Sequence, residues 1–475
     1  MKVFWICLCL IHFTACFTLA SGSPRLNLLF VLTEDQGAHA AYLGTPGIKT
    51  PAIDGLASTG VVFPHAFVAY PVCSASKASI YTGLHNHSNG ILNNTLNHHR
   101  HPDKVTAAEK NHPLYQKNRI HAEIPTLIEI LKNAGYHQGV SHKLHVIPVE
   151  KFPYDEFLKG NGKAVTSGFI SRAKAAGKPW HLFCNVPDSH RPYPNSDNQA
   201  IRVKPDEVRL PPYLPDTPVV RKDWAEYLAG IEEVDAHVQG ILEALRESGE
   251  ADRTIVVFLG DHGPTFARGK MTLYDGGLRT PLIIRTPDAK PGRRDDILVS
   301  TVDLAPTLLD LLELPPLPQS HGHSLAAVLR DPAAPSPREF VFAQISNRGP
   351  LPNDGIQERS IQDKRWKLIQ RWNTAAKWRQ VNADIIQRKP WGNRTYQETI
   401  QNKDRFPEAF RILAEQFPQT LKGSVPEIEL FDLSNDPFEM KNLATDPSHA
   451  DQLERLKSAL LAWRKQTRDS STIDP

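Results

Sequence analysis

The segment around Cys73 carries the clearest chemical signal in the sequence. Residues 71–83 read Pro-Val-Cys-Ser-Ala-Ser-Lys-Ala-Ser-Ile-Tyr-Thr-Gly, which predicts a helix that begins near Cys73. A helix N-terminus stabilises negative charge, and Lys77 one turn further along would add a cation. Both effects favour a reactive thiolate at residue 73. For an isolated cysteine, a buried and inert thiol is the ordinary alternative.

Acidic residues directly follow two apolar, strand-like segments, 27–33 and 254–260. Ligands of α/β sheets lie beyond the carboxyl ends of the strands, so these side chains are expected to meet there. Either acidic pair alone is more often a helix cap or turn. Together the carboxylates would repel one another unless a cation compensated them. Oxygen ligands favour Ca²⁺ or Mg²⁺, and the histidine leaves a softer divalent ion open. The candidate ligands are Glu34, Asp35, Asp261 and His262.

The elements that must position these residues alternate between strands and helices. Continuous apolar runs of the kind found in strands buried on both faces alternate with helical patterns. This alternation predicts an α/β fold with a large, mostly parallel sheet flanked by helices. The predicted strands are 27–33, 180–186, 254–260 and 281–285, and the predicted helices are 124–134, 224–247 and 304–312.

A proline-rich stretch, 315–337, separates this region from a more polar one. The sequence beyond it predicts a smaller C-terminal α+β subdomain with an antiparallel sheet. Its expected strands are 340–346, 366–372 and 428–433, followed by a closing helix over 449–467. We therefore divide the chain into a leader at 1–22, a catalytic domain at 23–335 and a C-terminal subdomain at 336–475.

The composition and the N-terminal segment indicate where the protein acts and which classes of partner are not expected. The 475 residues include 55 Lys and Arg against 52 Asp and Glu, a net charge of +3 that does not indicate nucleic acid or an anionic membrane as a partner. Residues 1–22 are typical of a secretory signal peptide, with a retained anchor as the alternative, and no later run is long enough to span a membrane. An exported protein of this kind would be periplasmic, secreted or, in an animal, lysosomal. Asn86, Asn93 and Asn393 begin possible glycosylation sequences for a eukaryotic secretory route.

Cleavage of the leader would leave Cys73 and Cys184 as the two remaining cysteines, enough for one disulfide at most. Cys184 lies within an apolar strand-like run and is expected to be an inert core residue.

Ordered motifs give the chain a resemblance to the formylglycine-dependent sulfatase family, closest to its heparan N-sulfatase (sulfamidase)-like branch. The family motif Cys-x-Pro-x-Arg followed by Thr-Gly corresponds to Cys73 through Lys77 and to Thr82-Gly83. The resemblance implies an alkaline-phosphatase-like fold. The other matching blocks are 34–35, 50–54, 143–145, 189–192, 261–262, 270–279 and 430–443.

The resemblance also implies a mechanism. A formylglycine-generating enzyme would oxidise Cys73 to formylglycine (3-oxoalanine), whose hydrate is the nucleophile, and residue 73 would join the metal ligands named above. Lys143 and Lys270 would hold sulfate oxygens, His145 would accept a proton from the diol, and His190 would donate one to the leaving atom. Lys77 completes the implied catalytic set.

Segment 210–242 and the Arg359-Ser360-Ile361-Gln362 sequence resemble the heparan N-sulfatase branch more than the arylsulfatases. The implied substrate is a sulfated carbohydrate, a glycosaminoglycan or another polysaccharide, with Arg191 and Arg359 as contacts to its acidic groups. Cleavage of an N-sulfo group and of an O-sulfate both fit this resemblance.

Three positions depart from the family pattern: Glu34 replaces Asp, Lys77 replaces Arg and His262 replaces Asn. Lys77 matters most, because the modifying enzyme reads the arginine as well as the cysteine. One alternative is therefore a catalytically silent homologue that binds sulfated glycans. Another is a phosphodiesterase or phosphonate hydrolase of the same superfamily.

Overall fold

A computed structural model describes residues 25–95, 104–193, 203–288, 290, 292–346, 357–372, 374 and 393–469. The predicted leader lies outside these residues. Within them, none of the helices has the length and apolar character needed to cross a membrane.

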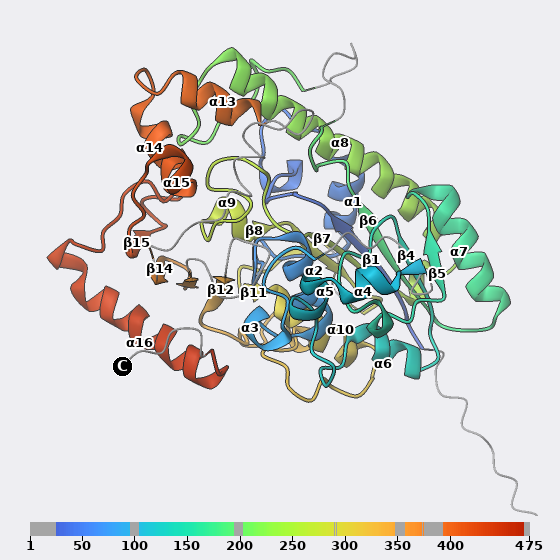
Figure 1. Ribbon diagram of the computed structural model, residues 1–475. Helices are drawn as coiled ribbons and strands as arrows, with labels where there is room; N and C mark the ends of the chain where they lie inside the picture. The colour runs from blue at the N-terminus through green and yellow to red at the C-terminus, as the bar shows by residue number, and fades with distance from the viewer. Residues whose placement is uncertain are drawn as a thin grey trace, which may run out of the picture.

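The large sheet has eight strands in the order β10-β2-β9-β7-β1-β6-β4-β5. Figure 1 labels five of them, β7, β1, β6, β4 and β5. Strands β7, β1, β6, β4 and β5 run parallel to one another, whereas β9 is antiparallel to both β7 and β2. The predicted mixed, mostly parallel sheet is confirmed. In sheet order the strands are Arg293–Arg294, Val61–Val62, Leu282–Arg285, Thr254–Gly260, Asn27–Thr33, Trp180–Val186, His137–Ser141 and Glu156–Leu158.

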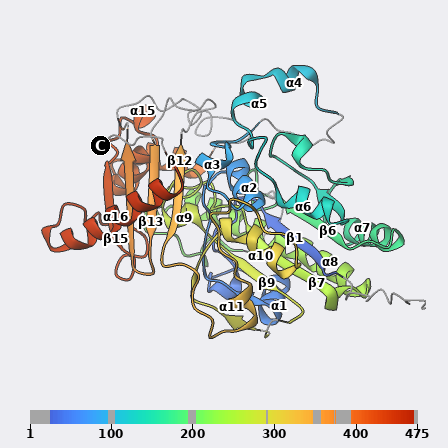
Figure 2. The same ribbon diagram turned by 90° about the horizontal axis from the view of Figure 1, so that it is seen from below.

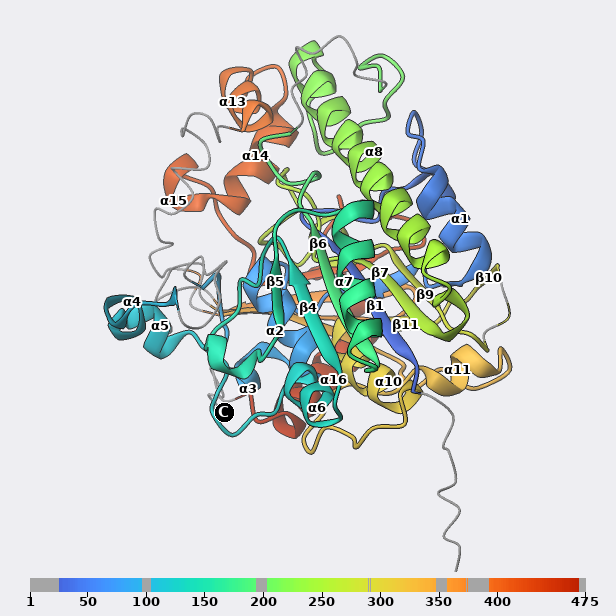
Figure 3. The same cartoon turned by 90° about the vertical axis from the view of Figure 1, so that its right-hand side faces the viewer.

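Helices cover both faces of this sheet because the central strands are apolar on both sides. In β1, Leu28 and Phe30 belong to one hydrophobic cluster, and Leu29 and Val31 belong to another. The first cluster includes α2 (Cys73–Thr82), α6 (Leu127–Asn133) and α10 (Leu304–Leu311). The second includes α1 (Pro51–Thr59), α7 (Lys163–Ala175) and α8 (Pro218–Glu247), and Figure 3 shows α7 and α8 side by side over their face. The continuous apolar runs therefore mark strands buried between two helical layers.

A three-stranded sheet, in the order β11-β3-β8, adjoins the first helical layer. Its strands are Leu298–Ser300, His65–Phe67 and Arg279–Thr280. Strand β3 leads through the 68–72 segment into α2 and so helps to place Cys73.

The antiparallel sheet of the C-terminal region has the order β12-β13-β14-β15, and α16 (Ala450–Gln466) packs against it (Figure 2). The three strands and the closing helix predicted here are present. β13 (Gln357–Gln362) was not predicted as a strand. The division of the chain at residue 335 stays a prediction. The other strands are β12 (Val341–Ser346), β14 (Trp366–Trp372) and β15 (Ile428–Asp432).

A pair of helices between β14 and β15 was also not predicted. α13 (Arg394–Gln401) and α14 (Pro407–Gln416) lie beside the N-terminal half of α8 (Figure 1).

Candidate active site

Strands β1 and β7 place the acidic residues together. Their parallel register sets Thr33 opposite Gly260, so the residues that follow leave the sheet at the same edge. There the backbone N–H of Asp35 donates to Asp261 Oδ1 at 2.8 Å. Asp35 has a φ of 55°, a left-handed conformation that turns the chain at the strand end. The predicted convergence of the two acidic pairs is present.

Helix α2 brings Cys73 to this edge. The helix begins at Cys73, as predicted, and all ten of its residues are buried. The Ser76 hydroxyl donates to the backbone carbonyl of Asp261 at 2.6 Å, which fixes the first turn of α2 against the end of β7. The small residues around Cys73 permit this close approach of helix and strand.

The Cys73 sulfur lies among cations. Its Sγ atom is 3.3 Å from both Lys270 Nζ and His262 Nε2, and 4.0 Å from Asp35 Oδ1. Burial opposes ionisation of the thiol, but Lys270, Lys143 and His262 outweigh it and hold the thiol pKa well below its ordinary value. The position favours an anion at residue 73, in agreement with the sequence argument.

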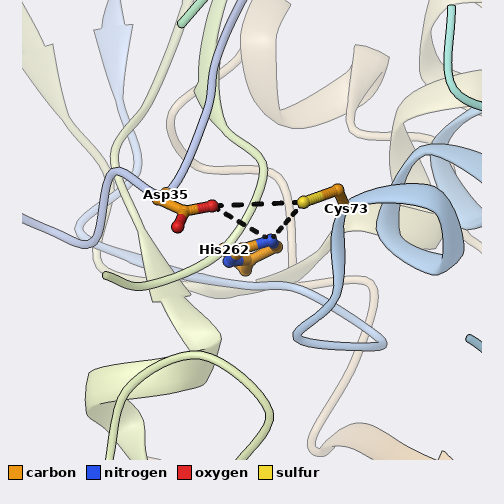
Figure 4. A group of neighbouring side chains, drawn as sticks. All are labelled: Asp35, Cys73 and His262. Atoms are coloured by element: carbon orange, nitrogen blue, oxygen red, sulfur yellow. Dashed lines mark hydrogen bonds and ion pairs between the residues drawn. The ribbon is translucent and has the colours of Figure 1, made fainter. Parts of the chain in front are cut away.

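Asp35, Cys73 and His262 form a compact group of metal-binding side chains (Figure 4). One ligand atom from each lies within 4.8 Å of the others, and His262 Nε2 is also 3.6 Å from Asp261 Oδ1. His262 Nδ1 faces the Gly263 carbonyl at 2.9 Å, which orients Nε2 toward the group. Oxygen and nitrogen donors in this arrangement fit a divalent cation, and the Cys73 sulfur lies close enough to join them.

The protonation of His262 reflects the charge of this group. Burial alone would lower its pKa, but Asp261 and the Cys73 thiolate raise the His262 pKa to about 9. A cation bound at Nε2 would replace that proton, so the same negative charge that retains the proton would attract a metal.

Glu34 is held by two lysines. Lys77 Nζ lies 3.4 Å from its Oε1 atom and Lys143 Nζ lies 2.9 Å from its Oε2 atom. Burial opposes ionisation of Glu34, but the two ammonium groups outweigh it and lower the Glu34 pKa below its usual range. Glu34 therefore joins the cluster as a carboxylate that lies between two cations.

His145 lies near Cys73, and its ring contributes to the lowered pKa of the thiol. Burial lowers the pKa of His145 to about 4, so the ring is neutral near pH 7. Its Nδ1 atom is buried without a hydrogen-bond partner among the described residues. A φ of 55° at His145 turns the ring toward the site from the segment after β4. A neutral imidazole next to residue 73 can accept a proton.

His190 lies at the solvent side of the cluster. Its side chain is 30% exposed, and its Nε2 atom is 3.9 Å from Asp35 Oδ2. The nearby ammonium groups of Lys143 and Lys270 are 10% and 13% exposed, respectively. These three side chains provide the polar groups through which a substrate could reach residue 73.

The two arginines predicted to contact substrate are both buried in ion pairs. Arg191 is 9% exposed, and its guanidinium donates to both carboxylate oxygens of Asp223 at 2.8 and 2.6 Å. Arg359 is 1% exposed and pairs with Asp469 at 2.6 Å. Both arginines occupy buried ion pairs, so substrate contact by either one stays a prediction.

Two hydroxyl groups at the site were not predicted. Thr265 donates to Asp35 Oδ2 at 2.9 Å, and Ser189 donates to the backbone carbonyl of Glu34 at 2.6 Å. Ser189 lies within the matching block 189–192, and Thr265 lies close to the block 261–262. Their place in the sequence beside these blocks could have identified them as site residues.

Two of the three possible glycosylation sequences are part of the interior. Asn86 is buried, and its Nδ2 donates to the carbonyls of Ala75 and Ile91. Asn393 is also buried. Neither side chain can carry a glycan in this fold.

Cys184 agrees with its predicted role. It is a buried residue of β6, and burial raises its thiol pKa to about 12. Among the described residues Cys73 and Cys184 are both free thiols, so residue 73 is not held in a disulfide with Cys184.

Comparisons with known proteins agree with the geometry. The family model described as Sulfatase matches residues 26–167 and 163–314, and that described as N-sulphoglucosamine sulphohydrolase, C-terminal, matches residues 260–390. An ulvan-active sulfatase of Formosa agariphila is 30% identical over 94% of this chain and 76% of its own length. Human N-sulphoglucosamine sulphohydrolase is 27% identical over 96% of this chain and 93% of its own length.

Solved structures share the fold at lower identity. A phosphonate monoester hydrolase of Agrobacterium radiobacter has a TM-score of 0.66 and 18% identity, and the match covers 93% of this chain and 96% of that one. A protein solved with its substrate D-glucosamine-2-N,6-O-disulfate has a TM-score of 0.64 and 18% identity, with 95% and 100% covered.

Proposed function

The chain belongs to the sulfatase family, as a sulfuric ester hydrolase similar to the N-sulphoglucosamine sulphohydrolase branch, and we propose that it removes sulfate groups from a sulfated carbohydrate with residue 73 as nucleophile. The observation that carries the proposal is the position of Cys73. Its Sγ atom lies 3.3 Å from both Lys270 Nζ and His262 Nε2, at the N-terminus of a buried helix. An anionic nucleophile there would face a sulfate held by cations.

Two groups would complete the site. Conversion of Cys73 to formylglycine would supply a hydrate oxygen as nucleophile, and a divalent cation would polarise sulfate oxygens and favour the ionised hydrate. Asp35, Asp261 and His262 would hold the cation together with residue 73, and Glu34 would add a carboxylate at the Lys77 and Lys143 side. We propose Ca²⁺ as the resident ion, with Mg²⁺ or another divalent ion as the alternative that the imidazole permits.

Four side chains of the chain itself have distinct roles in the proposed reaction. The ammonium groups of Lys143 and Lys270 bind sulfate oxygens and offset the charge that develops during transfer. The neutral ring of His145 accepts a proton at residue 73. His190, the most exposed of the four, donates a proton to the leaving oxygen or nitrogen.

The proposed substrate is a glycosaminoglycan or another sulfated polysaccharide. The support comes from the relatives, one named for activity on ulvan and one for N-sulphoglucosamine. The two names refer to different sulfated sugars. A screen of defined sulfated oligosaccharides would therefore determine which sulfate group is removed. The proposed site of action is outside the cytoplasm, after export by the leader at 1–22 and maturation by a formylglycine-generating enzyme.

Mass spectrometry of the tryptic peptide that carries residue 73 tests the nucleophile. The expected result in natively produced protein is the aldehyde or its hydrate at position 73, together with loss of sulfatase activity in Cys73→Ala. An unmodified thiol would favour a silent, glycan-binding homologue, for which Lys77 in the place of the motif arginine is the specific observation.

A second assay separates sulfatase from phosphonate hydrolase chemistry, because the fold is shared with a phosphonate monoester hydrolase. The mature protein is given an aryl sulfate and an aryl phosphodiester with the same leaving group. We expect the higher kcat/KM with the sulfate, and a strong preference for the phosphodiester would contradict the proposal.

A further inference from the structure

The loop formed by residues 263–271 supplies two groups to the catalytic cluster. Thr265 donates its hydroxyl to Asp35 Oδ2 at 2.9 Å, and Lys270 Nζ lies 2.8 Å from Asp35 Oδ1. Both oxygens of one candidate metal ligand are therefore oriented by this loop. An outer-sphere hydrogen bond of this kind fixes the direction in which a ligand presents its lone pairs.

The loop holds a strained conformation. Arg268 and Met271, on either side of Lys270, have φ values of 56° and 66°. Left-handed backbone at non-glycine residues costs on the order of 1 kcal/mol or more each and persists only when the surroundings enforce it. The loop therefore needs support from outside its own sequence.

That support comes from helices α13 and α14. Phe266 of the loop packs in one hydrophobic cluster with Trp224 of α8, Tyr396 of α13 and Leu413 of α14. The Phe266 and Trp224 ring centroids are 4.9 Å apart. The helix pair thus covers the face of the loop that does not carry Lys270 toward Cys73.

Two buried side-chain amides connect the helix pair to the 263–271 loop by hydrogen bonds. Asn393, which caps α13 and is fully buried, donates its Nδ2 to the carbonyl of Thr265 at 2.6 Å, while its Oδ1 accepts from Tyr396 N at 3.1 Å. Gln416 at the end of α14 accepts from Arg268 N at 3.2 Å and contacts the Lys270 carbonyl at 3.5 Å. The Asn393 amide therefore holds Thr265, which binds Asp35, and the Gln416 amide holds Arg268 and Lys270.

The first turn of α13 also reaches the His190 side of the cluster. Thr395 donates its hydroxyl to Asp223 Oδ2 at 2.6 Å, and Asp223 binds the guanidinium of Arg191, the neighbour of His190. Two buried residues of one helical turn, Asn393 and Thr395, thus connect to two segments that border the site, the 263–271 loop and the segment of His190.

We propose that Asn393 and Gln416 are positioning residues of the catalytic centre, which hold the 263–271 loop so that Thr265 and Lys270 orient Asp35. The inference rests on the proposed function for its consequence in catalysis. Its consequence for cation binding does not depend on turnover.

Asn393→Asp is the sharpest variant. An aspartate keeps the cap to Tyr396 N but replaces the donor to Thr265 O with an acceptor, so the contact becomes repulsive. Calorimetric titration of the chelator-treated full chain with Ca²⁺ and with Mn²⁺ measures the effect. We expect a 10- to 100-fold weaker cation affinity, the range typical of lost outer-sphere contacts. With an aryl sulfate, kcat should fall by a similar factor while KM changes little.

A double-mutant cycle tests the route through Thr265. Thr265→Val removes the hydroxyl that binds Asp35, so Asn393→Asp should add little to it if Asn393 acts through Thr265. If the losses of cation affinity in the two single variants multiply in the double variant, the proposal is overturned. It is also overturned if Asn393→Asp leaves both the cation affinity and kcat unchanged. Lys403→Ala, at an exposed position between the two helices, is the matched control and should leave both quantities unchanged.

Gln416→Leu provides a second test if Asn393→Asp does not fold. Leucine fills the same space without the amide that accepts from Arg268 N, so cation affinity and kcat should both fall in protein that remains folded. If the wild-type protein shows no sulfatase activity, the cation affinities of the variants still decide the positioning role, and the failure then belongs to the proposed function alone.

Discussion

Lys77 Nζ lies 3.3 Å from Asp261 Oδ2, and neither side chain is exposed to solvent. The same ammonium is 3.4 Å from Glu34, so one cation compensates two buried carboxylates. Lys77→Met would leave both carboxylates without it. Because removal of one partner from a buried ion pair typically costs about 3–5 kcal/mol, we expect a loss of that size in the free energy of unfolding, measured by urea denaturation. Lys77→Arg keeps the charge and should lose less, whereas a Lys77→Met variant as stable as the wild type would contradict the pairing.

The contribution of His190 to kcat should be larger for a poorer leaving group. A proton donated to the departing atom helps a sugar oxygen or nitrogen far more than a stable aryl oxide. His190→Ala should lower kcat on a sulfated oligosaccharide by about 10²–10⁴-fold and on an activated aryl sulfate much less. Steady-state kinetics with both substrates check this. Equal losses on the two would argue against proton donation by His190.

Removal of divalent cations should destabilise the protein. Asp35 and Asp261 lie close together in the interior, and a bound cation would relieve their repulsion. A cation at 100 times its dissociation constant adds about 2.7 kcal/mol to the free energy of unfolding. Chelation should lower the unfolding temperature, and Ca²⁺ should restore it. The same chelation of an Asp35→Asn variant is the comparison, and it should shift the unfolding temperature less.

Arg359 and Asp469 form a buried ion pair that we expect to stabilise the fold. Asp469→Asn removes the charge that faces the guanidinium, so the free energy of unfolding should fall by about 3–5 kcal/mol. Glu207→Gln, in an exposed pair with Lys204, should cost about 0–1 kcal/mol and serves as the control. In protein that remains folded, kcat/KM should be unchanged. A large rise in KM for sulfated sugars in Asp469→Asn would support a substrate role for Arg359.

Three stacked histidines predict a dependence of stability on pH. The rings of His85 and His321 have centroids 5.6 Å apart, and His87 lies 6.0 Å from His321. Burial lowers the pKa of His321 to about 4, and burial with the neighbouring histidines lowers the His85 pKa well below its ordinary value. The unfolded chain then binds more protons than the folded one below pH about 6.5, so stability falls as the pH drops from there toward 4.

Urea denaturation at a series of pH values measures this slope. His321→Gln removes one of the titrating rings and should flatten the dependence between pH about 6.5 and 4. The exposed His112→Gln is the control, because its ring lies outside the stack. An unchanged slope in His321→Gln would contradict the assignment.

The central sheet could be predicted from the sequence because its strands are buried on both faces. The runs that form β1, β6 and β7 are continuous and apolar, and their predicted limits agree with the observed ones. β13 was missed for the opposite reason. Its residues Glu358 and Arg359 are charged, yet both are buried by ion pairs with other segments.

The residues of the site also differ in how far they could be predicted from the sequence. The residues at strand ends, Glu34, Asp35 and Asp261, were predictable because parallel strands deliver the residues that follow them to one edge. The buried partner of Arg191 was not predictable, because a charged residue in a sequence does not reveal a partner 32 residues away. The support of Thr265 by Asn393 crosses 128 residues and has no local signal at all.

The pairing of β1 with β7 has a consequence for the order of events during synthesis. The two strands are separated by 227 residues, so at about 5–20 residues per second β1 waits on the order of 10–45 s for its partner to leave the ribosome. Throughout that time the end of α2 that bears residue 73 lacks the strand edge that later encloses it. The proposed modifying enzyme would therefore meet Cys73 on an open chain only before β7 is made, and completion of the sheet would end that access.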